Sequence, residues 1–308
     1  MTTSPVVSML GAPSNIGIRP YDDGTLRGLD RAPSVLRSRG LVERLHAQDL
    51  GDVVPPPYVD YVRPPHGVRN ESALMMYTDV LAHRVADAGR DGQFIVVVGG
   101  DCSIVVGSML GARRMTGKPV GLAYVDAHAD FATPQESATG SAASMCLSMV
   151  VGRGDTPLAR ILGDAPLALP SDVVLLGRRD AREPYGHEGL RALHVHDVPY
   201  ADIRARGVTS VLASATRVLE QPHLDGFWVH VDADVFDASV MQAVDSPTPD
   251  GPRLDELLEL VIPLVNHPRA LGMQLTIYDP TLDDANETCG QLLVEFLARA
   301  VASRGSAT

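Results

Sequence analysis

Short apolar runs and longer amphipathic stretches alternate along the whole chain. The apolar runs are rich in valine and leucine, end at glycine or aspartate, and show no alternation with polar residues, which is typical of strands buried on both faces. Clear strands are predicted at Val6–Leu10, Gln93–Val98, Val120–Asp126, Asp172–Gly177, Phe227–Asp232 and Ala270–Ile277, and weaker ones at Asp49–Val54 and Leu193–His196.

Stretches with helical periodicity lie between these runs. The predicted helices are Ala32–His46, Glu71–Gly89, Ile104–Met115, Tyr200–Leu219, Leu254–Val265 and Glu287–Ser303. Strands that alternate with helices form a parallel sheet with helices on both faces. Because no internal repeat or low-complexity linker divides the sequence, we predict a single domain over residues 1–308. Its fold is a three-layer α/β/α sandwich with a mostly parallel central sheet of about eight strands.

Composition and charge narrow the class of protein. The 308 residues are 45% hydrophobic, and the net charge of −12 argues against partners such as nucleic acids or anionic membranes. Three widely spaced cysteines give no disulfide framework and suit a reducing compartment. We find neither a signal peptide nor an apolar run long enough for a membrane span. The sequence therefore predicts a cytoplasmic protein that acts on a small molecule.

An acidic motif follows one of the predicted strands. The apolar run Gly121–Val125 leads into Asp126-Ala127-His128-Ala129-Asp130, and ligands of parallel sheets gather at the carboxyl ends of strands. If the backbone stays extended, residues two apart share a face, so Asp126, His128 and Asp130 converge. A solvated acidic loop is the alternative, but such a loop needs neither the histidine nor its spacing.

A second acidic motif repeats this arrangement about a hundred residues later, where Phe227–Val231 leads into Asp232-Ala233-Asp234. Four aspartates at the ends of two buried strands repel one another unless cations offset their charge. Two divalent ions would neutralise four carboxylates. Ligation by oxygen with one imidazole suits manganese or magnesium better than iron, cobalt, nickel or zinc.

At these residues the chain resembles the arginase, agmatinase and formimidoylglutamase (ureohydrolase) family, in which D-x-H-x-D and D-x-D motifs hold two manganese ions. Other matching segments are Gly11-Ala12-Pro13, Ala32–Arg37, Gly99-Gly100-Asp101, Thr133–Gly140 and Asp234–Pro249. The resemblance covers nearly the whole chain. It implies an arginase-like fold, a small nitrogen-containing substrate and possible assembly as a homotrimer or hexamer.

Roles carried over from the family cover metal binding and catalysis. One metal ion would take Asp126, Asp130 and Asp232, and the other Asp126, His128, Asp232 and Asp234, with Cys102 at the position of a further metal-binding histidine. The implied reaction is attack of a metal-bridging hydroxide on an amidine or guanidine carbon. The candidate catalytic residues are Asp130, Asp234 and His230, with a structural histidine of the strand as the alternative role for His230. Candidate substrate-binding residues are Thr133, Ser137, Thr139, Ser141 and Tyr278.

Three positions depart from the family pattern. Cys102 replaces the metal-binding histidine, and it is either a thiolate ligand or a neutral buried thiol. Ala143 stands at the position of the proton-shuttling histidine, and Ile277 at that of the glutamate that binds the guanidinium group. Without that carboxylate, a cationic guanidinium loses its main charge partner, so arginine itself is not the expected substrate.

The leading hypothesis is a dinuclear, manganese-dependent hydrolase that cleaves a linear C–N bond of a small amidine, guanidine or hydroxyguanidine-type compound. Two alternatives stay open. One is a non-catalytic binding or partner protein with the same fold, and the other is a metallohydrolase that acts on a different amide-like substrate.

Overall fold

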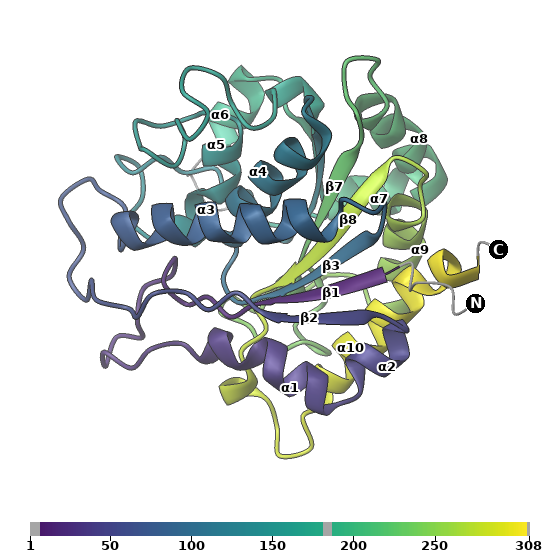
Figure 1. Cartoon of the computed structure of the whole chain (residues 1–308), viewed down its shortest axis with the longest axis horizontal. Helices are drawn as coiled ribbons and strands as arrows, with labels where there is room; N and C mark the ends of the chain where they lie inside the picture. The colour runs from purple at the N-terminus through teal and green to yellow at the C-terminus, as the bar shows by residue number, and fades with distance from the viewer. Residues whose placement is uncertain (1–6, 181–186, 307–308) are drawn as a thin grey trace.

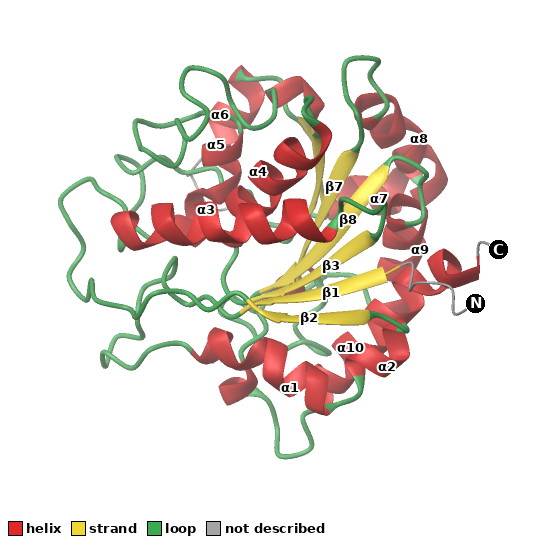
Figure 2. Cartoon of the chain, viewed as in Figure 1, coloured by secondary structure: helices red, strands yellow, loops and turns green. Residues whose placement is uncertain are grey.

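An all-parallel sheet organises the chain (Figure 2). In the computed structural model, which describes residues 7–180 and 187–306, eight strands pair in the order β2-β1-β3-β8-β7-β4-β5-β6. The strands are β1 Val7–Ala12, β2 Gln48–Asp52, β3 Phe94–Gly99, β4 Gly121–Val125, β5 Val173–Leu176, β6 His196–Val198, β7 Phe227–Asp232 and β8 Ala270–Thr276. The predicted fold class is confirmed, while Val6, the predicted start of the first strand, lies outside the described residues.

Helices cover both faces of the sheet (Figure 1). One layer contains α3 Glu71–Ala88, α4 Ile104–Thr116 and α5 Cys146–Val150; the other contains α1 Ala32–Ser38, α2 Leu41–Leu45, α8 Val208–Leu219, α9 Leu254–Val265 and α10 Thr288–Val301. In the chain, α6 His187–Ala192 precedes β6 and α7 Tyr200–Arg206 follows it. The 3-10 helices are η1 Gly28–Arg31, η2 Ala142–Met145, η3 Pro170–Asp172, η4 Ala233–Val235, η5 Pro280–Leu282 and η6 Ala302–Ser306. Among the described helices, none is long and apolar enough to cross a lipid bilayer.

The prediction of two continuous helices was wrong. The stretch Ala32–His46 forms α1 and α2, and Tyr200–Leu219 forms α7 and α8. Gly40 and Gly207 separate the two members of each pair with positive φ angles of 77° and 80°, which interrupt the helix and which glycine adopts without strain. The short helices α5 and α6 were not predicted.

The edge strand β2 differs from the central strands. Its residues are exposed or half-buried, whereas β1, β3, β4 and β7 are buried along their full length. Arg37 of α1 pairs with Asp49 at 2.9 Å and with Asp52 at 2.6 Å, so charged side chains cover this edge.

The register of the central strands brings four chain segments to one level. Val98 of β3 and Val231 of β7 both pair with Leu275 of β8, and Val231 also pairs with Val125 of β4. The residue that follows each of these positions therefore lies at the same carboxyl edge of the sheet. This edge carries both acidic motifs.

The loop after β3 packs so closely on the loop after β1 that Gly100 has no room for a side chain. A Cβ atom there would lie 1.7 Å from the carbonyl oxygen of Ser14, a backbone atom that cannot rotate away. We expect Gly100→Ala to lower the free energy of unfolding by roughly 3 kcal/mol or more. Gly117→Ala is the matched control, because φ is 70° there but the space is open, and it should cost only about 1–2 kcal/mol. Equal losses in urea unfolding would contradict this account of the loop.

Candidate metal centre

The carboxyl edge of the central strands carries a buried acidic cluster. Asp126 follows β4, Asp232 ends β7, and Asp234 lies in η4, while Cys102 follows β3. Each of these four side chains is almost wholly buried, and all four line a pocket of about 610 Å³. The two acidic motifs that the sequence singled out thus meet at one site.

Two groups of side chains have the geometry of metal ligands. Within each group the ligand atoms lie within 4.8 Å of one another: Cys102, Asp126, His230 and Asp232 form the first, and Asp126, His128 and Asp234 the second. Asp126 belongs to both. Three atoms of these residues, Asp126 Oδ2, His230 Nε2 and Asp234 Oδ1, are buried and find no hydrogen-bond partner among the described residues. Buried polar atoms are normally satisfied, so the two carboxylates, Asp126 and Asp234, fit a bound cation.

Tight turns aim the carboxylates. The backbone N–H of His128 donates to Asp126 Oδ1 at 2.6 Å, and that of Asp234 donates to Asp232 Oδ1 at 2.7 Å. The expectation that the first motif stays extended was wrong, because Asp130 has a φ of 46°. The two-residue spacing works here by closing a turn around the first aspartate of each motif.

Asp130 lies beside the two ligand groups and belongs to neither. It lines the same pocket, but its Oδ2 accepts a hydrogen bond of 2.7 Å from the Tyr124 hydroxyl and one of 3.5 Å from the Cys146 thiol. Burial raises the pKa of Asp130 to about 7. The structure therefore brings five of the six predicted metal ligands into these groups and adds His230, with Asp130 as a close neighbour.

The charges in the cluster cannot all coexist without a cation. Burial and the charge of Asp234 raise the pKa of Asp126 well above its ordinary value, and the same two causes raise the pKa of Asp232. Burial also works to raise the pKa of Asp234, but the charge of His128, whose Nδ1 lies 2.9 Å away, outweighs it and lowers that pKa. Burial disfavours the His128 imidazolium, yet Asp234 raises its pKa well above the usual range. One carboxylate thus balances one imidazolium, while Asp126 and Asp232 favour their protonated forms.

The Cys102 thiol faces the same carboxylates. Its Sγ donates to Asp232 Oδ2 at 2.7 Å and lies 3.4 Å from the Thr276 hydroxyl. Burial, followed by contact with the Cys146 thiol, raises the pKa of Cys102 well above its ordinary value. In the absence of a cation the side chain is therefore a neutral thiol, and it must lose its proton before it can coordinate as a thiolate.

Three of the predicted substrate-binding residues line the pocket. Ser137 Oγ accepts the backbone N–H of Gly140 at 3.0 Å, Thr139 Oγ1 that of Ser141 at 3.2 Å, and Ser141 Oγ that of Arg19 at 3.0 Å. Because each hydroxyl oxygen already accepts a backbone N–H, its proton is left to donate. The loop therefore presents hydrogen-bond donors to the pocket.

The other two predicted substrate-binding residues are not among the residues that line the pocket. Tyr278 follows Ile277, which lines the pocket, and its hydroxyl instead donates to Asp283 Oδ2 at 2.8 Å. The backbone of Thr133 donates to Glu136 Oε2 at 2.8 Å in a turn.

Sequence reasoning missed an ion pair in the pocket wall. Arg27, only 6% exposed, pairs with Asp245, and its guanidinium lies 4.2 Å from the centre of the Tyr21 ring. All three residues line the pocket. The partners come from segments far apart in the chain, so no local pattern marks them.

Ile277 combines an unusual conformation with a central position. It lines the pocket and is 4% exposed. Its φ of 68° is strained for a β-branched residue, and its backbone N–H donates to Gly100 O at 2.8 Å. Ala143 lines the same pocket, so Ile277 and Ala143 both present apolar surface to it.

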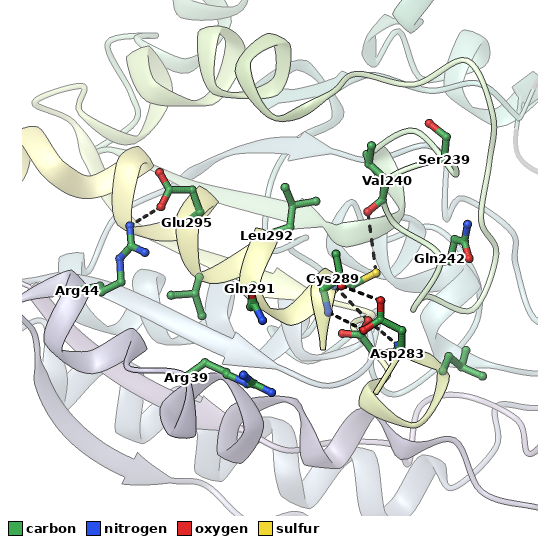
Figure 3. A pocket seen from close by; sticks show the side chains of 14 residues that line it. Arg39, Arg44, Ser239, Val240, Gln242, Asp283, Cys289, Gln291, Leu292 and Glu295 are labelled. Atoms are coloured by element: carbon green, nitrogen blue, oxygen red, sulfur yellow. Dashed lines mark hydrogen bonds and ion pairs between the residues drawn. The ribbon is translucent and has the colours of Figure 1, made fainter. Parts of the chain in front are cut away.

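A second hollow, of about 960 Å³, lies along α10 (Figure 3). Its wall includes Arg44 and Glu295, which form an ion pair, and the carbonyl of Val240, which accepts a weak hydrogen bond from Cys289. Neither group of candidate metal ligands reaches it. The chemistry of the cluster therefore belongs to the smaller pocket.

Comparison with known proteins extends these observations. A sequence model described as the arginase family matches residues 8–302. Arginase from Bacillus caldovelox is 28% identical over 292 residues, which cover 92% of this chain and 93% of that protein. Arginase from Staphylococcus aureus is 26% identical over 299 residues, which cover 94% and 95%. The solved structure of the Bacillus caldovelox arginase aligns with a TM-score of 0.83 at 26% identity and covers 97% of this chain and 98% of that one.

The raised pKa of Asp130 predicts a pH effect on stability in the absence of metal. Between 3.8, its ordinary pKa, and about 7, the folded state binds more protons than the unfolded state, so stability falls as pH rises through this window. Asp130→Asn removes the titration. With a metal chelator present, we compare the free energy of unfolding of this variant with that of the unsubstituted protein. The difference, variant minus unsubstituted, should rise by roughly 2–4 kcal/mol from pH 4 to pH 7.5. A difference in urea unfolding that does not change with pH would refute the assignment.

Proposed function

The chain belongs to the arginase family. From this premise we propose that it hydrolyses a linear C–N bond of a small amidine, hydroxyguanidine or related substrate. The reaction would use two divalent metal ions, and manganese is the first candidate. Members of the family are metal-dependent hydrolases of C–N bonds other than peptide bonds and act on small nitrogen-containing molecules. The observation that carries the proposal is the pair of ligand groups that share Asp126.

The two ligand groups divide between two ions. Cys102, Asp126 and Asp232 would hold one, and Asp126, His128 and Asp234 the other. Divalent ions in such a site lower the pKa of water and stabilise negative charge that develops on the substrate. Carboxylate oxygens with one imidazole suit manganese, whereas the Cys102 thiol moves the preference of the first group toward softer ions.

Asp130 is the proposed acceptor for the proton of the attacking water. It lines the pocket next to the cluster, belongs to neither ligand group, and is held by hydrogen bonds from Tyr124 and Cys146 through one oxygen only, Oδ2. Ala143 supplies no imidazole at the position of the family's shuttle histidine. Proton transfer therefore falls to a carboxylate.

The pocket wall favours a substrate whose reacting end is uncharged. Ile277 offers no carboxylate for a guanidinium cation, which would lie next to apolar surface. The hydroxyl protons of Ser137, Thr139 and Ser141 favour an acceptor, such as a carboxylate or carbonyl, elsewhere in the molecule. We therefore place the substrate among small amidine-like or amide-like compounds that carry such a group.

Metal analysis and product identification test the proposal. Elemental analysis should give about two divalent ions per chain, and chelation should abolish turnover of a panel of such compounds, with mass spectrometry identifying the product. Asp126→Ala should lose both ions, and Asp232→Ala should lose at least one and reduce turnover roughly a hundredfold or more. Exposed Asp164→Ala is the control and should leave both readouts unchanged. Turnover that survives chelation and both substitutions would exclude a metal-dependent mechanism.

Substitution at Ile277 tests the substrate class. Ile277→Glu places a carboxylate at the pocket wall and removes the β-branch that makes a φ of 68° most costly, so the fold should persist. We expect turnover of guanidinium compounds such as arginine or agmatine to rise at least tenfold (~1.4 kcal/mol of added stabilisation) and turnover of uncharged substrates to fall. Ile277→Gln, which adds the same bulk without charge, should not show this rise. If both variants behave alike, charge at this position does not set specificity.

A further inference from the structure

His230 stands next to the shared carboxylate and is held by two neighbours on the sheet. Trp228 lies two residues before it on β7, and Gln274 on β8 is its partner in the strand register. All three side chains are fully buried. Trp228 Nε1 donates to Gln274 Oε1 at 3.1 Å, and Gln274 Nε2 lies 2.8 Å from His230 Nδ1.

The direction of these bonds fixes the position of the histidine proton. An indole N–H can only donate, so it selects the oxygen of Gln274 and turns the amide nitrogen toward His230. An amide N–H also only donates, so His230 Nδ1 must accept. In a neutral imidazole the single proton then lies on Nε2. An imidazolium would place two donors against each other, as would the other tautomer.

The ring has no freedom to change this arrangement. Tyr124, opposite His230 in the register of β4 and β7, stacks on the imidazole with a centroid distance of 4.0 Å and an interplanar angle of 17°. If Gln274 rotated its amide to accept from Nδ1, its nitrogen would face the Trp228 N–H. Each alternative leaves two buried donors in contact, and the observed set is the one in which every bond has a donor and an acceptor.

The Nε2 atom points at Asp126. It lies 4.0 Å from Asp126 Oδ2, and neither atom has a hydrogen-bond partner among the described residues. If the two atoms moved roughly 1 Å closer together, they would form an ordinary hydrogen bond. Coordination of a metal by Nε2 would instead require a lone pair on that atom, where the hydrogen bonds from Trp228 to Gln274 and from Gln274 to His230 place a proton.

We propose that His230 is a positioning residue and not a metal ligand: its Nε2–H, fixed by Trp228 and Gln274, donates to Asp126 and orients the carboxylate that both ligand groups share. This rests on the proposed function only in that Asp126 holds metal. A neutral donor also withdraws charge from that carboxylate, which makes the bound ions more electrophilic. With Nδ1 engaged and Nε2 protonated, His230 does not act as the general base.

A pair of substitutions separates a donor from a ligand. His230→Ala should weaken divalent metal binding roughly 10- to 100-fold, as the loss of an outer-shell partner does. In His230→Gln the side-chain amide keeps an N–H toward Asp126 and an oxygen toward Gln274, so the dissociation constants should return to within about threefold of the unsubstituted values. They are measured for Mn²⁺ and Zn²⁺ by competition with a chromogenic chelator. Equal weakening in both variants would identify a nitrogen ligand and overturn the proposal.

Neutron diffraction of the full chain without metal gives a direct reading that needs no variant. A deuteron on His230 Nε2 and none on Nδ1 is expected, and a deuteron on Nδ1 would overturn the proposal even if the alanine variant fails to fold. Neither measurement uses turnover. A protein with the expected tautomer and no hydrolytic activity would refute the proposed function alone, and an active protein with the other tautomer would refute this inference alone.

Discussion

Mutual repulsion among carboxylates gathered at one edge of a buried sheet is the constraint around which this molecule is arranged. The register of four neighbouring parallel strands brings Asp126 and Asp232 to the same level, with Asp234 one turn further. Burial removes the water that would solvate their charge. Without a cation the cluster keeps protons on Asp126 and Asp232 and pairs Asp234 with His128. The loops, the turns and the neutral neighbours of the cluster all serve to hold these groups together.

The residues that differ from the expected family pattern make the wall of the pocket less ionic. A neutral thiol at Cys102, a methyl group at Ala143 and an apolar side chain at Ile277 stand where the resemblance to the family leads us to expect two imidazoles and one carboxylate. New polar features lie elsewhere: the ion pair of Arg27 with Asp245 in the pocket wall, and His230 behind Asp126. The site thus keeps the acidic cluster, while the residues around it carry fewer charges.

Much of the fold followed from local pattern, because both faces of a parallel sheet are buried and its strands read as unbroken apolar runs. The acidic motifs were also visible, since each aspartate follows such a run. Helix breaks at Gly40 and Gly207 and the turned backbone of Asp130 depend on φ angles that residue type alone does not determine. The hydrogen bonds that join Trp228, Gln274 and His230 depend on the register of β7 and β8, which the sequence does not determine. The single-domain organisation, the cytoplasmic location and assembly as a homotrimer or hexamer stay predictions.

The polar edge strand β2 bears on how copies of this chain can associate. A strand with an unpaired side is a template for another strand, yet here carboxylates and the Arg37 guanidinium surround it, and a second copy would bring like charges together. Continuous sheets running from one molecule into the next are disfavoured at this end. Copies that associate along this edge would therefore meet through the helices or loops around β2 and not through the strand itself.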